Sequence, residues 1–231
     1  MKLNTEVVHK YISSNPNLKA FYQYYLGNCL SLSVPYHNMR HTLGMIYHII
    51  RMYEKSKTDI STDVHITDDD LYILITSALF HDYNHSAGRF SDQVNVRNAK
   101  DGLECCLRNI LPASDLSDRI ILSCKKNIDA TLYPYIIPDD ELDIQQRILR
   151  EIDILVCLYD DFITQSLMGL AAEMHQANLM NFSVDYLKFL LKSIESLKLK
   201  YCVDTWLQER ERFLAEIDAF AEAVSQEENK Q

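Results

Sequence analysis

Residues Thr67–Asp82 read TDDDLYILITSALFHD, and this stretch decides the fold class. Thr67 followed by three aspartates is typical of a capping box, in which the threonine accepts from the third backbone N–H and the acids lie at the positive end of a helix. The residues Leu71–Phe80 that follow are apolar on nearly every side. The stretch therefore predicts a central, buried helix over 67–80 that ends in a histidine and an aspartate.

The composition of the 231-residue chain also favours helices. Hydrophobic residues make up 47%, and only five Gly and five Pro leave few tight turns, which argues against a sandwich or barrel. The sequence shows no repeat, linker or domain boundary, so we expect a single compact all-α bundle of about nine helices over 1–231. Besides the central helix, we expect helices over 17–33, 35–55, 93–111, 115–131 and 139–161, and three more over 162–225.

Charge and cysteine usage narrow the classes of partner and compartment. A net charge of −10 argues against binding a nucleic-acid backbone, which requires clustered Lys and Arg. The longest apolar stretch, 71–80, is too short to cross a bilayer, so we expect no membrane partner. The six cysteines show no C-x-x-C spacing, which is typical of reduced, mostly buried thiols in a cytoplasmic protein.

Four of the eight histidines lie in two short motifs with the spacing of metal ligands. The motifs are Tyr36-His37-Asn38-Met39-Arg40-His41 and His81-Asp82-Tyr83-Asn84-His85. Because proline suits the first turn of a helix, Pro35 is expected to start the helix over 35–55. His37 and His41 are four residues apart, so we expect them on one face of that helix. His48, seven residues further on, is expected to be structural.

A third region supplies one more candidate ligand. The expected helix over 139–161 carries an inward apolar stripe, and Asp153 lies on that stripe. A lone carboxylate on a buried face is costly unless it is paired or binds a metal. We therefore prefer Asp153 over Asp129 and Asp160 as the carboxylate that completes the site.

Imidazoles and carboxylates together suit one or two divalent ions such as Zn, Mn, Fe, Co or Mg. Such an ion lowers the pKa of bound water and polarises a phosphoryl oxygen. Asp82 has two carboxylate oxygens and could therefore bridge two ions. An imidazole that does not bind metal could protonate a leaving alkoxide.

The order H…HD…D on a helical chain resembles the HD superfamily of metal-dependent phosphohydrolases. Tyr36-His37-Asn38-x-x-His41 followed by His81-Asp82-x-x-His85 resembles more closely the catalytic domain of class I cyclic nucleotide phosphodiesterases. The resemblance covers about 34–160. It implies metal ligands at His41, His81, Asp82 and Asp153. It further implies that Asp82 bridges to a second ion, that His37 is the general acid, that His85 lies beside the reacting water, and that Tyr36 and Asn38 contact the substrate.

The chain also departs from that family. Ser86-Ala87-Gly88 replaces the Pro-Gly that follows the second motif, and Gln165 and Gln176 are the nearest candidates for the family's purine-binding glutamine. The resemblance thus predicts the reaction better than the substrate. We expect an enzyme that hydrolyses a phosphoester of a small nucleotide-like substrate, with cyclic nucleotides among the candidates. The alternatives are a phosphomonoesterase for nucleoside monophosphates and a catalytically idle HD domain that binds metal and senses a nucleotide.

Overall fold

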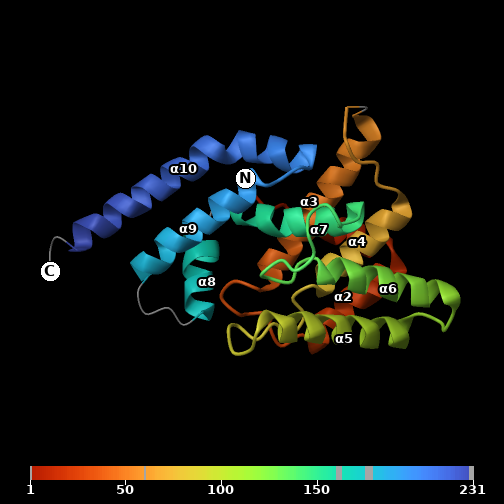
Figure 1. The fold of residues 1–231 in the computed structure, drawn as a ribbon. Coiled ribbons are helices and arrows are strands. Elements are labelled where there is room, and N and C mark those ends of the chain that lie inside the picture. The colour runs from red at the N-terminus through yellow and green to blue at the C-terminus, as the bar shows by residue number, and fades with distance from the viewer. Residues whose placement is uncertain (1, 60, 160–162, 175–178, 229–231) are drawn as a thin grey trace.

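The computed structural model of the protein describes residues 2–59, 61–159, 163–174 and 179–228 (Figure 1). Every regular element in these ranges is helical, which confirms the all-α fold class. The α-helices are α1 (Thr5–Ser14), α2 (Pro16–Asn28), α3 (Met39–Thr58), α4 (Asp68–Phe80), α5 (Asp92–Ile110), α6 (Asp115–Asp129), α7 (Ile144–Leu155), α8 (Met168–Glu173), α9 (Leu179–Glu195) and α10 (Lys200–Glu228). A 3₁₀ turn, Val156–Leu158, follows α7, and a π-helical turn, Ile163–Leu167, precedes α8.

Helix α4 is the central helix that its sequence predicts. It packs against α2, α3, α5, α6 and α7, so it meets neighbours on all sides. The capping box is formed: Thr67 Oγ1 accepts from the N–H of Asp70 at 3.1 Å, and Asp70 Oδ2 accepts from the N–H of Thr67 at 3.0 Å. Leu74 and Phe80 are fully buried, and each contributes about 1.5–3 kcal/mol through burial.

The start of α3 differs from the prediction. The helix begins at Met39 instead of Pro35, because Asn38 has extended backbone angles and its Oδ1 accepts from the N–H groups of Arg40 and His41. Consequently His37 lies outside the helix, in a segment of turns and bends, and the expected common helical face of His37 and His41 is wrong.

Two other predicted boundaries are also wrong. Helix α2 ends at Asn28, well before residue 33, with Cys29 already extended. Helix α7 begins at Ile144, because Asp143 caps it by accepting from the N–H of Gln146 at 2.9 Å. Strong local caps thus shorten helices whose apolar periodicity continues further along the chain.

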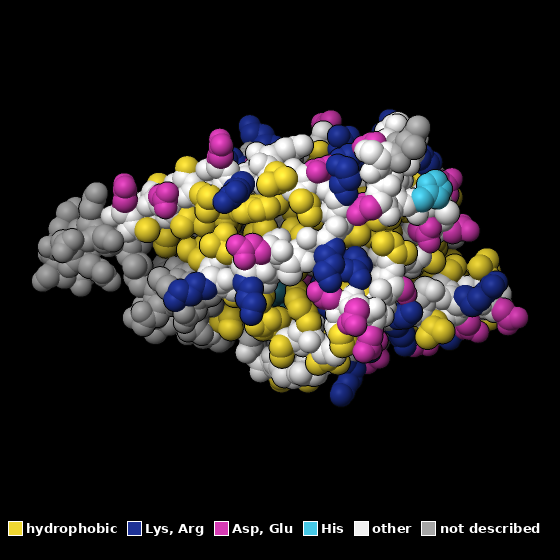
Figure 2. Space-filling model, turned by 45° about the horizontal axis from the view of Figure 1, so that its top comes forward, with side chains coloured by type: hydrophobic (Ala, Val, Ile, Leu, Met, Phe, Trp, Pro, Cys, Tyr) yellow, Lys and Arg dark blue, Asp and Glu magenta, His cyan; other side chains and the backbone are white. Residues whose placement is uncertain are grey.

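The C-terminal helices form a second layer that projects from the bundle. Helix α10 runs past α9, and the C-terminus lies at its far end (Figure 1). Hydrophobic side chains remain visible at the surface along this projecting part (Figure 2). Within the described ranges, no helix is both long enough and apolar enough for a bilayer crossing. All six cysteines lie in these ranges and are free thiols, and five of them are buried.

Two glycines provide a matched test of packing beside the second histidine motif. A Cβ at Gly102 in α5 would overlap the ring of Tyr83, whereas a Cβ at Gly27 would meet no described atom within 4 Å. We expect Gly102→Ala to lower the free energy of unfolding by about 1–3 kcal/mol because of overpacking. Gly27→Ala should leave it unchanged or raise it by up to about 1 kcal/mol. Urea unfolding followed by circular dichroism measures both, and equal effects would contradict the packing.

Candidate metal centre

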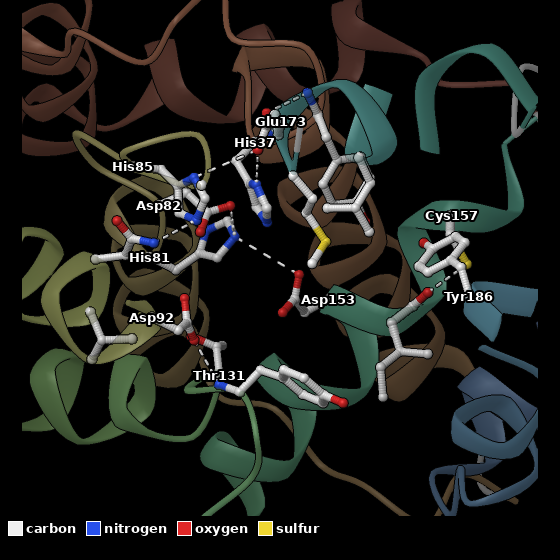
Figure 3. A pocket seen from close by; sticks show the side chains of 18 of the residues that line it. His37, His81, Asp82, His85, Asp92, Thr131, Asp153, Cys157, Glu173 and Tyr186 are labelled. Atoms are coloured by element: carbon white, nitrogen blue, oxygen red, sulfur yellow. Dashed lines mark hydrogen bonds and ion pairs between the residues drawn. The ribbon is translucent and has the colours of Figure 1, made fainter. Parts of the chain in front are cut away.

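Four predicted ligands converge from three helices that are distant in the sequence. His41 lies in the first turn of α3. His81 and Asp82 directly follow α4, and Asp153 lies in α7 (Figure 3). His41 Nε2 lies 3.1 Å from His81 Nε2, 3.3 Å from Asp82 Oδ2 and 3.1 Å from Asp153 Oδ1. His81 Nε2 lies 2.8 Å from Asp82 Oδ2 and 3.9 Å from Asp153 Oδ1. The ligand atoms of His41, His81 and Asp82 all lie within 4.8 Å of one another and could hold one ion, and Asp153 Oδ1 lies beside the two imidazoles.

A backbone carbonyl orients the ring of His81. Its Nδ1 lies 2.8 Å from the carbonyl oxygen of Ala78, and a carbonyl oxygen can only accept, so Nδ1 carries the proton. The lone pair of Nε2 therefore faces His41 and Asp82. A second hydrogen bond that fixes the tautomer in this way is the usual arrangement for a metal-binding histidine.

The donor set fits a cation for a direct electrostatic reason. Asp82 Oδ2 is buried and has no hydrogen-bond partner among the described residues, although two imidazole nitrogens lie within 3.3 Å of it. Lone pairs that converge so closely repel one another unless a proton or a metal ion lies between them. The C-terminal end of α4 adds the negative end of a helix dipole. Burial lowers the pKa of His81, but Asp82 and Asp153 raise it to about 9, so the local field favours a cation.

A second group of ionisable side chains lies beside these ligands. His37 Nδ1 lies 2.6 Å from Glu173 Oε2, and Glu173 Oε1 accepts from the N–H groups of Tyr36 at 2.6 Å and His37 at 2.8 Å. The ring of His85 stacks on that of His37, with centroids 3.7 Å apart and an interplanar angle of 32°. Glu173, at the end of α8, therefore fixes both the backbone and the ring of His37 (Figure 3).

The environment separates the pKa values of the two stacked histidines. Burial lowers the pKa of His37, but the charge of Asp82 and the hydrogen bond to Glu173 outweigh it, so the pKa is raised. For His85, burial and the neighbouring charge of His37 lower the pKa to about 4. Burial raises the pKa of Glu173, but the hydrogen bonds and the charge of His37 lower it by more, so the net shift is downward. The surroundings thus favour the protonated form of His37 and the ionised form of Glu173, whereas the pKa of His85 leaves that ring neutral near pH 7.

His85 is held by protein groups on both ring nitrogens. Asn95 Oδ1 accepts from the N–H of Ser86 at 3.0 Å, and Asn95 Nδ2 lies 2.9 Å from His85 Nε2. On the other side, His85 Nδ1 lies 3.2 Å from the N–H of Ala87 and 3.7 Å from Glu173 Oε2. His85 therefore packs against His37 and lines the same cavity as His81 and Asp82, and its place beside the reacting water stays a prediction.

Except for His41, the side chains of the two groups line the polar end of one cavity of about 660 Å³, a volume in the usual range of ligand sites. Tyr36 lines it, as expected for a substrate contact. The opposite wall is largely apolar and aromatic and includes Ile154, Cys157, Tyr186 and Phe189. Ala87 and Gly88 have positive φ angles, and a Cβ at Gly88 would overlap the carbonyl of Glu173, so this loop packs directly against α8.

Some sequence-predicted residues have other roles. Asn38 does not line this cavity: Oδ1 caps α3, and Nδ2 donates to the carbonyls of Val34 and Pro35. Asn38 thus has a structural role at the start of α3, and its substrate contact stays a prediction. Asp129 pairs with Lys100 at 2.5 Å, away from the metal ligands. His48 is buried and bonds to the hydroxyl of Tyr201 at 3.0 Å, which agrees with a structural role. Asp160, Gln176 and the side chain of Gln165 lie outside the described residues.

Sequence reasoning missed Glu173 and Asn95. Glu173 contacts His37 across 136 positions, and the surrounding Ala171-Ala172-Glu173-Met174 carries no motif. Asn95 lies ten residues after His85 in an ordinary amphipathic helix. The remaining signal for Glu173 was an acid beside small residues in an otherwise apolar segment, which is too weak to single it out.

The sequence matches no protein-family model, and a comparison with curated proteins gave no significant match.

Removal of a ligand should abolish metal binding. We expect His41→Ala and Asp153→Ala to weaken binding of Mn²⁺ or Zn²⁺ by more than about 100-fold, since loss of even an outer hydrogen-bond partner typically costs 10- to 100-fold. Elemental analysis after dialysis against each metal would measure this loss. His37→Ala is the control, because His37 bonds to Glu173 and should leave metal content unchanged. Equal metal content in all variants would contradict the assignment.

The role of Glu173 can be tested on the titration of His37. In Glu173→Gln the amide oxygen can still accept from the N–H groups of Tyr36 and His37, but the negative charge is gone. We expect the pKa of His37 to fall, because the carboxylate favours the imidazolium form. NMR titration of the imidazole resonances measures it. The exposed Glu195→Gln is the control, and an unchanged pKa in Glu173→Gln would refute the pairing.

Proposed function

We propose that the protein is a metal-dependent phosphohydrolase that cleaves a phosphodiester bond of a small nucleotide-like substrate. One observation carries the proposal: three of the four candidate metal ligands and the hydrogen-bonded His37–Glu173 pair line one cavity, and the fourth ligand, His41, contacts the other three. A metal site alone would equally suit a structural or sensing role. An acid beside it gives the arrangement the two parts that phosphoester hydrolysis requires.

The ligands suit a borderline or hard divalent ion. His41, His81, Asp82 and Asp153 offer two imidazole nitrogens and carboxylate oxygens, which fits Zn, Mn, Fe, Co or Mg better than a soft ion. When bound, such an ion supplies Lewis acidity toward a phosphoryl oxygen and lowers the pKa of water.

His37 is placed to give a proton to the leaving oxygen. Glu173 engages Nδ1, so Nε2 remains to donate into the cavity that His37 lines. The raised pKa favours the protonated form of the ring, and the neutral His85 stacked on it adds no competing charge. This pairing of an oriented imidazole with a buried carboxylate is a general arrangement for acid catalysis.

The charge of the cavity favours a diester over a monoester. Among the described residues that line it there is no Lys or Arg, whereas Asp92 and Glu173 add carboxylates to those of the metal ligands. A monoester dianion would meet more repulsion here than a diester, which carries one charge. Aromatic side chains on the far wall, including Tyr133, Tyr135 and Phe189, suit stacking on a nucleobase.

The proposal can be tested by a screen of cyclic nucleotides, nucleoside monophosphates and p-nitrophenyl phosphodiesters with Mn²⁺, Mg²⁺, Co²⁺ and Zn²⁺. We expect turnover of diesters that disappears in His41→Ala. Bound metal without turnover of any of these esters would overturn the proposal and favour the sensor alternative. Faster turnover of monoesters than of diesters would favour the phosphomonoesterase.

The acid role of His37 predicts a dependence on the leaving group. His37→Ala should lower kcat by about 10²–10⁴ for a diester with an alkoxide leaving group, which needs a proton. With p-nitrophenolate, which leaves without protonation, the loss should be less than tenfold. Metal content measured in parallel shows that the ligands are intact. Equal losses on both substrates would refute the acid role.

A further inference from the structure

A second cavity, of about 330 Å³, adjoins the first. The two cavities meet at the four side chains that line both of them, Tyr133, Tyr135, Ile154 and Phe189. The second cavity lies between α7, α9 and the segment that connects α6 to α7.

The second cavity is lined by cations, in contrast to the first. Arg147 and Arg150 from α7 and Lys192 from α9 line it. Of its two carboxylates, Asp139 bonds to Arg150 at 3.0 Å, and Glu151 accepts from the N–H groups of Lys198 and Leu199. Glu151 is thus already engaged with backbone amides. The lining of the second cavity therefore has three cationic side chains and two carboxylates, so its net charge is positive.

Arg150 is the buried anchor of this cationic wall. Its side chain is only 4% exposed, and its Nε and Nη1 donate to the carbonyls of Ala130 and Ile137 at 2.8 and 3.0 Å. Its Nη2 has no hydrogen-bond partner among the described residues. A buried guanidinium nitrogen without an acceptor is unusual, and carboxylate or phosphate is the partner that matches its geometry.

One helix connects the two sites. Asp153, a candidate metal ligand, lies three residues after Arg150 and six after Arg147 in α7. By helical rise these positions are roughly 4.5 and 9 Å apart along the axis. Two anionic groups on one small molecule, separated by one to two helical turns, could therefore reach the metal ligands and the arginines together.

We propose that the second cavity binds another anionic group, a phosphate or carboxylate, of the same substrate whose phosphodiester lies at the metal ligands. This inference rests on the proposed function and specifies its substrate class. The substrate is then a diester with an additional anion, of which a 5′-phosphorylated dinucleotide is a simple example. The first cavity repels surplus negative charge, and the second supplies the missing cations.

The test compares two substrates that differ only in that anion: thymidylyl-(3′→5′)-thymidine and its 5′-phosphorylated form. With Mn²⁺, the wild-type kcat/KM should be at least tenfold higher for the phosphorylated form. In Arg147→Gln/Lys192→Gln the ratio should fall to about one. Arg150 is left in place because it also holds the carbonyls of Ala130 and Ile137. Lys188→Gln, one turn away on α9 and outside the cavity lining, should keep the wild-type ratio.

Equilibrium binding separates failure of this inference from failure of the proposed function. In His37→Ala, calorimetry should show that the phosphorylated dinucleotide binds at least tenfold more tightly than the unphosphorylated one. Adding Arg147→Gln and Lys192→Gln to this variant should remove the difference in affinity. Both results are expected whether or not either compound is hydrolysed. Equal affinity for the two dinucleotides would overturn the inference. It would also be overturned if inorganic phosphate alone bound in a manner that depends on Arg147 and Lys192 while the dinucleotides bound equally. The site would then serve a free anion.

Discussion

The convergence of lone pairs on Asp82 Oδ2 is the constraint on which the rest of the structure depends. Two imidazole nitrogens lie within 3.3 Å of this buried oxygen, and no described donor satisfies it. Such an arrangement is stable only if the surrounding helices hold it rigidly and a cation relieves the repulsion. Helix α4 supplies the rigidity, because it is packed on all sides and ends directly at His81. The apolar surface of α4 thus serves the polar site, because the packing of this helix holds His81 and Asp82 in place.

Local chemistry made part of this arrangement predictable from the sequence. The capping box at Thr67 and the unbroken apolar run fix α4, and with it the position of His81 and Asp82. The cost of a lone carboxylate on an apolar face pointed to Asp153, and the structure brings it within 3.1 Å of His41. These inferences succeeded because each depends on one element and on a burial cost that side-chain pattern reveals.

The parts that could not be predicted depend on contacts between distant segments. Pro35 and the four-residue spacing of His37 and His41 suggested one helix, but Asn38 caps α3 and leaves His37 in the preceding turns. That segment keeps its shape because Glu173, from α8, accepts two of its N–H groups. No local preference of residues 35–38 encodes this bond. A pattern can show that two histidines are spaced as ligands, but not that a distant carboxylate will withdraw one of them from the metal.

The stacked pair of His37 and His85 favours the proposed hydrolysis over an idle domain that only binds metal. Burying two imidazoles and a carboxylate beside a metal site opposes folding through desolvation, and apolar side chains of similar volume would avoid that cost. The two stacked rings nevertheless have separated pKa values, since the pKa of His37 is raised while that of His85 is lowered to about 4. When the environment shifts the pKa values of two imidazoles in opposite directions, one ring is suited to donate a proton and the other is not. A protein that only held a metal would gain nothing from it. The arrangement of these side chains therefore supports turnover at this site over sensing alone.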